Sequence, residues 1–177
     1  MVPLVLTFVG DDRPGLVNAI SDKVAACGAT WLDSRSARLA GKFAGILLVG
    51  VSDARAAELQ SSLRELEAAG LRLTVERGAA SDAEQPPGRI VKLDLFGHER
   101  PGIVRDVTEA LTSLGVNIEE FDSGLESAPF TGAEMFRARA RLLAPEKLGV
   151  EDLRRALERL AGEIMVDLTV ADEEAHG

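Results

Sequence analysis

The chain carries the stretch Gly10-Asp11-Asp12-Arg13-Pro14-Gly15-Leu16-Val17 and repeats it as Gly97-His98-Glu99-Arg100-Pro101-Gly102-Ile103-Val104. The copies are 87 residues apart, so two such lengths nearly fill the 177 residues. Each copy follows an apolar run and precedes a helical pattern. A second matching phrase follows each helix, Cys27-Gly28-Ala29-Thr30 or Leu114-Gly115-Val116-Asn117-Ile118. A repeat of this length predicts a tandem of one supersecondary unit.

Hydrophobic periodicity predicts the order β-α-β-β-α-β in each half. In the first half we expect strands at 2–9, 29–39, 43–52 and 71–76, and helices at 14–27 and 54–69. In the second half we expect strands at 91–95, 116–126, 134–143 and 164–170, and helices at 103–114 and 150–161. Asp12 and Asp53 are candidate helix N-caps, and Pro14 fits a first helical turn. Short connections favour antiparallel sheets with both helices on one face, so the predicted class is α+β with two ferredoxin-like domains.

The composition also predicts where the domains meet. Residues 79–88 include Ser81, Pro86 and Pro87 and have the composition of a semi-stiff linker. We therefore expect a first domain at 1–78, a linker at 79–88, a second domain at 89–171 and an acidic tail at 172–177.

Charge and cysteine content exclude several classes of function. The formal charge is −9; residues 1–80 are balanced, and residues 89–177 carry a net −7. Such a balance repels phosphate backbones and argues against direct nucleic-acid binding. The single cysteine, Cys27, allows no intrachain disulfide and no cysteine metal cluster, and we expect it to be a buried structural thiol. Apolar runs stop short of the roughly 18 residues of a membrane span, and the start lacks a leader pattern, so a soluble, cytoplasmic protein is expected.

The repeated loops have the chemistry of a small zwitterion site. A helix N-terminus presents unpaired N–H groups that attract a carboxylate, and a glycine leaves room for its approach. The acidic residues could meet an ammonium group: Asp11 and Asp12 in one copy, Glu99 beside His98 in the other. The alternative is that the loops provide only turn and capping chemistry. Both interpretations stay open on the residues alone.

No motif in the chain indicates catalysis. GxSxG, HExxH, P-loop and dinucleotide fingerprints are all missing. Neither His98 nor His176 has a second histidine at ligand spacing, so no metal or cofactor is predicted. Acylphosphatases use this fold and bind phosphate through a loop arginine, and Arg13 and Arg100 occupy such loops. The neighbouring carboxylates would repel phosphate, so this enzyme class is only an alternative.

Two further features are expected to be structural. Arg137, Arg139 and Arg141 alternate along one predicted strand, which places them on one face. The preceding strand carries the acidic residues Glu119, Asp122 and Glu126, and cross-strand ion pairing is the expected arrangement. The longer hairpin loop of the second half carries Phe130, either as a partner contact or packed on its own domain.

The phrases Asp12-Arg13-Pro14-Gly15-Leu16-Val17 and Glu99-Arg100-Pro101-Gly102-Ile103-Val104, with the glycine-containing phrases that follow them, resemble the ACT domain. Two such units and nothing else resemble the glycine cleavage system transcriptional repressor family. The segments Asp33-Ser34-Arg35 and 127–136 resemble that family too.

This resemblance implies a non-enzymatic regulatory protein that senses a small amino acid, with glycine as one candidate. It implies ligand contacts, at interfaces between paired domains, from these positions: Asp11, Asp12, Arg13, Pro14, Gly15, Leu16, His98, Glu99, Arg100, Pro101, Gly102, Ile103 and Asn117. Thr30 stands at the asparagine position of the first half, and Asp12 and Glu99 stand where serine-sensing dehydrogenase relatives have asparagine. The resemblance also implies a transcriptional regulator as partner protein, and the exposed sheet edges make a homodimer plausible. A ligand-free interaction scaffold is the main alternative.

Overall fold

A computed structural model describes residues 1–79, 87–128, 132–160 and 165–170 of the chain. The chain divides into two compact units, Met1–Glu84 and Gln85–Gly177. Most of the predicted linker, the whole acidic tail and Phe130 lie outside the described residues, so the exact domain boundaries stay predictions.

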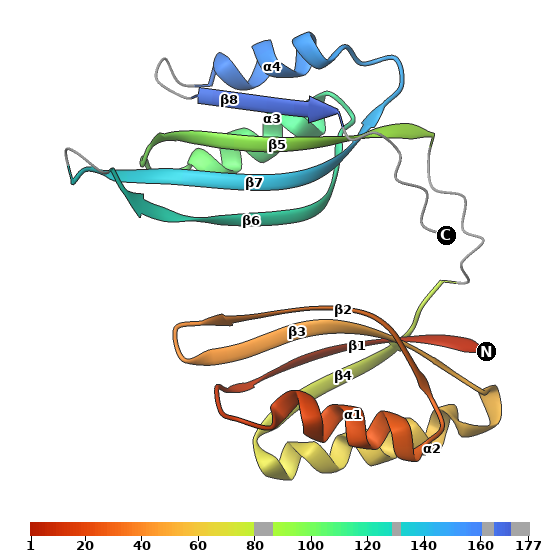
Figure 1. The fold of residues 1–177 in the computed structure, drawn as a ribbon. Coiled ribbons are helices and arrows are strands. Elements are labelled where there is room, and N and C mark those ends of the chain that lie inside the picture. The colour runs from red at the N-terminus through yellow and green to blue at the C-terminus, as the bar shows by residue number, and fades with distance from the viewer. Residues whose placement is uncertain (80–86, 129–131, 161–164, 171–177) are drawn as a thin grey trace. The chain divides into compact units, whose positions relative to one another are not determined.

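The described part of the first unit, residues 1–79, has seven elements: β1 (Val2–Asp11), α1 (Leu16–Ala26), β2 (Thr30–Leu39), β3 (Lys42–Val51), α2 (Asp53–Arg64), the 3-10 helix η1 (Glu65–Ala69) and β4 (Leu71–Arg77). The sheet order is β2-β3-β1-β4, with every neighbouring pair antiparallel. Figure 1 shows α1 and α2 on one face of this sheet.

The second unit repeats the arrangement with β5 (Gly88–His98), α3 (Ile103–Ser113), β6 (Asn117–Ser127), β7 (Glu134–Pro145), α4 (Val150–Glu158) and β8 (Met165–Val170). Its sheet order is β6-β7-β5-β8, again antiparallel throughout. The predicted α+β class and the tandem of two ferredoxin-like units are therefore confirmed.

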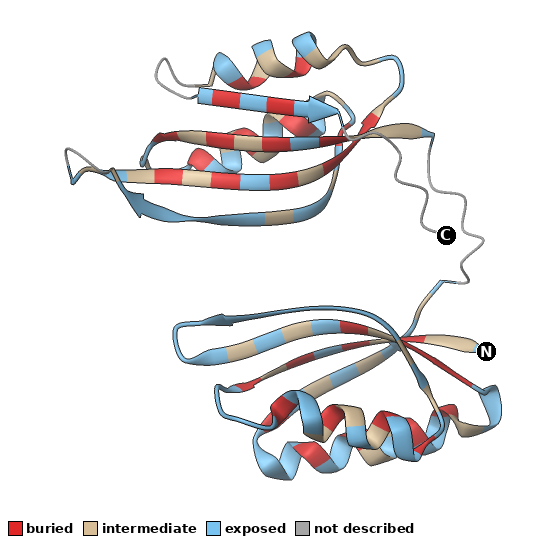
Figure 2. Cartoon of the chain, viewed as in Figure 1, coloured by how far each residue is buried: buried red, intermediate tan, exposed pale blue. Residues whose placement is uncertain are grey.

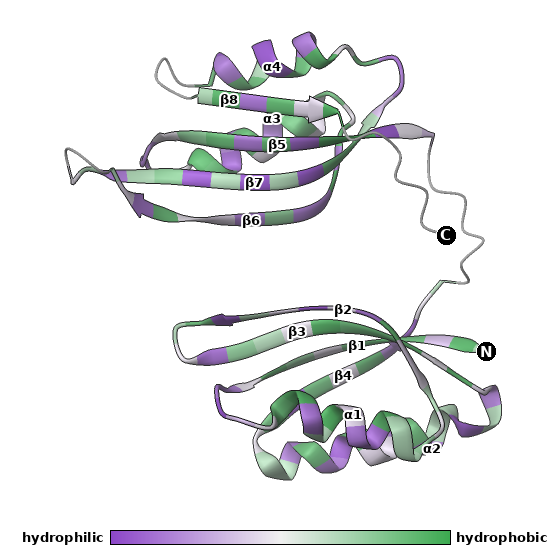
Figure 3. Ribbon diagram, viewed as in Figure 1, coloured by the Kyte–Doolittle hydropathy of each residue, from purple (hydrophilic) through white to green (hydrophobic). Residues whose placement is uncertain are grey.

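Each unit has its own hydrophobic core between the sheet and its two helices. The central strands bury alternate residues toward the helices, such as Leu4 and Leu6 in β1 or Leu93 and Leu95 in β5 (Figure 2). The edge strand β2 is mainly polar, whereas its neighbour β3 is mainly apolar (Figure 3). This contrast follows from burial, because an edge strand lies partly beyond the helical layer.

The helix α1 begins later than the expected residue 14, whereas α3 begins at Ile103, as expected. The N-cap of α1 is Gly15 with φ 91°, and that of α3 is Gly102 with φ 87°; neither helix has a side-chain cap. This left-handed region is readily open only to glycine. The predicted N-cap Asp12 is therefore wrong, because the chain still has to turn through Pro14 and Gly15 before the helix starts.

The second helix of the first unit also differs in detail. Its N-cap is Ser52, and the predicted cap Asp53 is the first helical residue. The single helix expected at 54–69 is an α-helix that continues as the 3-10 helix η1. Gly70 then ends the segment, as expected.

The edge strands β2 and β6 each contain a β-bulge, at the same place in the repeat. The pairing of β2 with β3 skips Leu32, and the pairing of β6 with β7 skips Glu119. One extra residue is thus accommodated in each edge strand without moving its partner. Beyond the bulge in β6, Phe121, Ser123 and Leu125 lie opposite buried β7 residues and share the helix-covered face.

Candidate functional site

The second loop, residues 97–102, joins β5 to α3 and exposes the start of that helix. The Ile103 N–H donates to the Arg100 carbonyl at 3.2 Å, and the Asp106 N–H donates to the Gly102 carbonyl at 3.0 Å. Gly102 has no side chain with which to cap the helix. The other N–H groups of the first turn have no intrahelical acceptor, so they are available to an anionic group.

The loop arginines have a structural role that the sequence did not indicate. Arg100 donates through Nη2 to the Leu160 carbonyl at 3.1 Å, and Arg13 donates through Nη2 to the Ala69 carbonyl at 2.6 Å. Leu160 lies just beyond α4, and Ala69 is the last residue of η1, which continues α2. A cation is favourable at such helix ends. Each arginine therefore ties its loop to the end of that helical segment, and this geometry argues against a phosphate-binding role.

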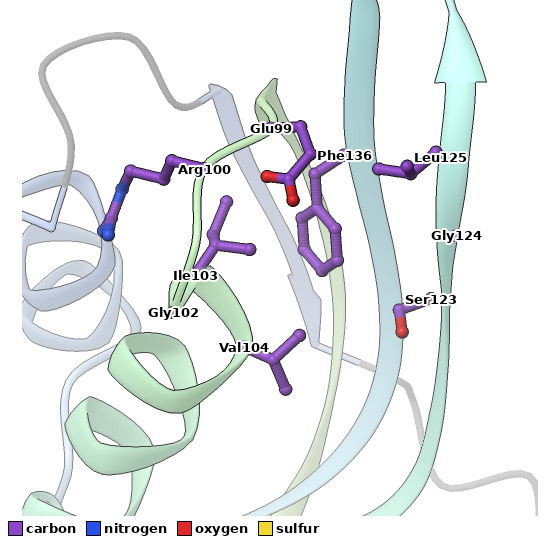
Figure 4. A pocket seen from close by; sticks show the side chains of 9 residues that line it. All are labelled: Glu99, Arg100, Gly102, Ile103, Val104, Ser123, Gly124, Leu125 and Phe136. Atoms are coloured by element: carbon purple, nitrogen blue, oxygen red, sulfur yellow. The ribbon is translucent and has the colours of Figure 1, made fainter.

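Arg100 also forms an ion pair with Asp106 of α3 at 2.7 Å. This hydrogen bond, with a second one from Arg105, holds the pKa of the Asp106 carboxyl below its usual value. Figure 4 shows Arg100 and Glu99 leaving the second loop in opposite directions. The Arg100 guanidinium thus stabilises the loop and helix ends, whereas the carboxylate of Glu99 lies on the side of Phe136.

A pocket of about 280 Å³ lies between the second loop and the edge strand β6 (Figure 4). Its lining residues are Glu99, Arg100, Gly102, Ile103, Val104, Ser123, Gly124, Leu125 and Phe136. The walls are mostly apolar, and polar groups come from Glu99 and Ser123. Ligand pockets of roughly 300–1,000 Å³ hold drug-sized molecules, so this pocket suits a smaller one.

Glu99 is the charged group of this pocket that remains available. It is exposed, and it forms no ion pair with any residue in the part of the chain that the structure describes. Near it, Val104 is 39% exposed and Leu125 is 55% exposed. The site therefore combines a free carboxylate, a helix N-terminus and an uncovered aliphatic surface.

In the first loop, residues 10–15, the corresponding acidic residues already have partners. Asp11 forms an ion pair with Lys42, which holds the pKa of the Asp11 carboxyl below its usual value. Asp12 pairs with Arg38 at 2.7 Å, and its N–H donates to the Gly41 carbonyl at 2.9 Å. The β2–β3 hairpin thus neutralises both carboxylates proposed to meet a ligand's ammonium group.

Asn117 does not lie with the loop of its own unit. It starts β6 opposite Leu143 of β7, whereas the pocket lies at the other end of β6, where Leu125 is opposite Phe136. These β7 positions are seven residues apart, which is about 23 Å at a rise of about 3.3 Å per residue. Thr30 lies opposite Gly50, so it is at the same far end of the first sheet.

The remaining predicted site residues are divided between the turn and the core. Leu16 and Ile103 are buried, and Ile103 also lines the pocket. Pro14 and Pro101 form the exposed turns before the helices, and His98 is exposed at the end of β5.

The structure adds five pocket residues that the sequence did not single out as ligand contacts: Val104, Ser123, Gly124, Leu125 and Phe136. Val104 belongs to the repeated motif, but nothing in the motif indicates a wall contact. Leu125 stands 87 residues after Arg38, and this exchange of an arginine for a leucine is a sequence signal that could have been noticed.

The predicted cross-strand ion pairs of β7 are confirmed for two arginines. Arg141 pairs with Glu119 at 2.9 Å, and Arg137 reaches Glu126 at 3.6 Å. Asp94 of β5 is an additional partner, 2.7 Å from Arg137 and 3.4 Å from Arg139. The hydrogen bond from Arg137 is the main cause that lowers the pKa of the Asp94 carboxyl.

Two searches for other kinds of site give negative results within the described ranges. No group of three or more His, Cys, Asp or Glu residues there is arranged to hold a metal ion. No helix described by the structure is both long and apolar enough to cross a membrane. Cys27 is a buried free thiol, as expected.

The model of the ACT domain family matches residues 2–76, which is the first unit without its last residues. These residues are an ACT domain. The second unit repeats its strand order and its helix placement, so the chain is a tandem of two units with the fold of an ACT domain. The solved structure of an unknown protein from Galdieria sulphuraria matches this tandem, with a TM-score of 0.78 and 29% identity over 97% of this chain and 99% of its own.

Two curated proteins are similar over most of the chain. The glycine cleavage system transcriptional repressor of Escherichia coli (strain K12) is 27% identical over 164 residues, covering 91% of this chain and 85% of the repressor. The phosphoserine phosphatase SerB2 of Mycobacterium tuberculosis is 27% identical over 175 residues, covering 97% of this chain and 41% of the phosphatase. The ACT domain and the similarity to the repressor support a regulatory role for the chain.

Proposed function

We propose that this ACT tandem is a non-enzymatic regulator that senses a small amino acid and modulates transcription through a protein partner. The observation that carries the proposal is the pocket between the second loop and β6. It offers the N-terminus of α3 for a ligand carboxylate and the free carboxylate of Glu99 for an ammonium group. A zwitterion needs both, and the volume of about 280 Å³ fits a small one.

Other observations support a regulator over an enzyme. Arg13 and Arg100, the candidate phosphate-binding residues, are engaged with helix-end carbonyls. The similarity to the phosphatase covers less than half of that enzyme. The similarity to the repressor covers most of both chains. The acylphosphatase alternative is therefore disfavoured.

The proposed route to transcription is through a partner protein because the chain itself is acidic, with a formal charge of −9. The edge strands β2 and β6 are largely exposed, and their unpaired edges are where a homodimer or a partner would pair.

Isothermal titration calorimetry with glycine, L-serine, L-alanine and L-valine tests the sensor. We expect saturable binding of at least one of them, and Glu99→Gln to weaken it. Arg139→Gln is the control, because its guanidinium lies on the other face of the sheet. If no amino acid produces heat of binding, and none changes the NMR chemical shifts of the protein, the ligand-free scaffold would be favoured.

The partner step has a separate test. The purified chain, with and without the bound amino acid, is added to DNA carrying a promoter of glycine cleavage genes in a gel-shift assay. We expect no shift by the chain alone, and a change only when the transcriptional regulator of that promoter is also present. A direct shift by the chain would contradict the partner-mediated route.

A further inference from the structure

Arg38 and Leu125 occupy the same place in the two units. They are 87 residues apart, as the loops are. Arg38 lies opposite Phe43 in β3, and Leu125 lies opposite Phe136 in β7. Each phenylalanine in turn lies opposite the glycine that begins its repeated loop. The first unit, which has Arg38, can therefore be compared directly with the second unit, which has Leu125 at the equivalent position.

The carboxylates beside these residues are also equivalent, since Asp12 and Glu99 are 87 residues apart. In the first unit the guanidinium of Arg38 is 2.7 Å from the Asp12 carboxylate. In the second unit the strand position holds Leu125, and Glu99 has no ion-pair partner among the described residues. The first unit thus supplies from its own strand the cation that the second unit lacks.

We infer that the second unit takes its cation from a ligand at Glu99, while the first unit is closed to such a ligand by its own Arg38. This rests on the proposed function and names the ligand class: a small amino acid whose ammonium group meets Glu99 and whose aliphatic side chain covers Leu125. One chain therefore binds one ligand, although it contains two copies of the loop.

The wall of the pocket supports an aliphatic side chain over glycine. Phe136 is 5% exposed and forms a buried floor, whereas Val104 and Leu125 are 39% and 55% exposed. Each buried methylene contributes about 0.8 kcal/mol, so affinity is expected to rise roughly fourfold per methylene from glycine to alanine and valine.

A reciprocal exchange of the two residues tests the inference. Calorimetry and backbone NMR use L-alanine, L-valine and n-propylammonium as probes. For the wild type we expect one site per chain, with shifts at Glu99 and along Ser123–Leu125. Leu125→Arg supplies the guanidinium internally and should weaken binding at least tenfold. Arg38→Leu should leave that site intact and add a second site in the first unit.

The controls separate charge from position and folding. Leu39→Arg adds the same charge at a leucine that is 76% exposed on the edge strand of the first unit, and it should leave affinity unchanged. Circular dichroism melting checks the fold of Leu125→Arg. If that variant does not fold, Glu99→Gln carries the test, because it removes the carboxylate at an exposed position.

The outcomes distinguish this inference from the proposed function. Two equal sites in the wild type, or unchanged affinity in both Leu125→Arg and Glu99→Gln, would overturn the inference while the amino-acid sensor survives. Binding of n-propylammonium at Glu99 without any amino acid would keep the cation site and overturn the sensor. Failure of all probes to bind would overturn both.

Discussion

The two units have one backbone plan but different side chains on the strand that lies beside the first helix. Toward that helix, the edge strand of the first unit presents Trp31, Ser34, Ser36 and Arg38. The edge strand of the second presents Ile118, Phe121, Ser123 and Leu125 at the same positions. The first set is mostly polar and includes Arg38, which pairs with Asp12, whereas the second is mostly apolar and lines an open pocket. The two units therefore differ most in this strand, although the repeated loop is the more conspicuous motif.

What the units share is the set of residues that fixes the backbone. Gly15 and Gly102 supply the same left-handed turn before the helix. Arg13 and Arg100 tie the loops to equivalent helix ends. These residues recur because the fold needs them in both copies, so their recurrence is no evidence that both copies bind a ligand.

The largest effect is expected from the cores. Leu6 and Leu93 are equivalent residues, 0% and 2% exposed, in the central strands. Replacing either by alanine leaves a cavity and should lower the free energy of unfolding by roughly 2–5 kcal/mol. Because the cores are separate, hydrogen exchange should show each variant destabilising its own unit. Equal loss of protection in both units would contradict this independence.

A smaller effect is expected at the helix starts. Gly102→Val forces a β-branched residue to φ 87° and should reduce the stability of the second unit by roughly 1–3 kcal/mol. Gly15→Val should behave alike in the first unit. Gly124→Ala is the matched control, because its φ is ordinary and a Cβ there meets open space. Urea unfolding measures all three, and a Gly102→Val protein as stable as wild type would refute the conformational role of this glycine.

The smallest effect is expected from an ion pair that only the second unit has. Asp106 pairs with Arg100, whereas its counterpart in the first unit is Ala19. Because folding lowers the pKa of Asp106, its contribution is present above the unfolded pKa of about 3.9 and is lost as pH falls through the folded value.

Stability curves between pH 5 and pH 2 should therefore fall less steeply for Asp106→Asn than for the wild type. The difference should shrink in high salt, because the pair is partly exposed. Parallel curves for the two proteins would show that the pair is not linked to folding.

The sequence was sufficient for the fold because its signals are local and repeated. Alternation in β5 identified Leu93 and Leu95 as core residues. The 87-residue repeat meant that each element predicted in one half supported the equivalent element in the other. The N-caps were mispredicted because Asp12 has a good capping side chain, but the turn through Pro14 and Gly15 delays the helix.

The candidate site was less accessible from the sequence because it depends on pairing between strands. Simple alternation from Ile118 would turn Glu120 and Asp122 toward the helices, and nothing local marks Glu119 as an extra residue. Asn117 follows α3 closely in the chain, but the helix runs back along the sheet and leaves it at the far end. The sequence therefore predicted the second loop as part of the site, but it did not predict β6 as the opposite wall of the pocket.

The bulge in β6 also sets how this strand responds to changes in length. A one-residue deletion in a regular strand turns every following side chain to the other face. Deletion of Glu119 would instead restore regular pairing and leave Phe121, Ser123 and Leu125 facing α3, with the ion pair to Arg141 lost. The pocket wall is therefore insensitive to a deletion at this one position. A slip of the strand by one residue, in contrast, would direct acidic side chains into the groove and be disfavoured.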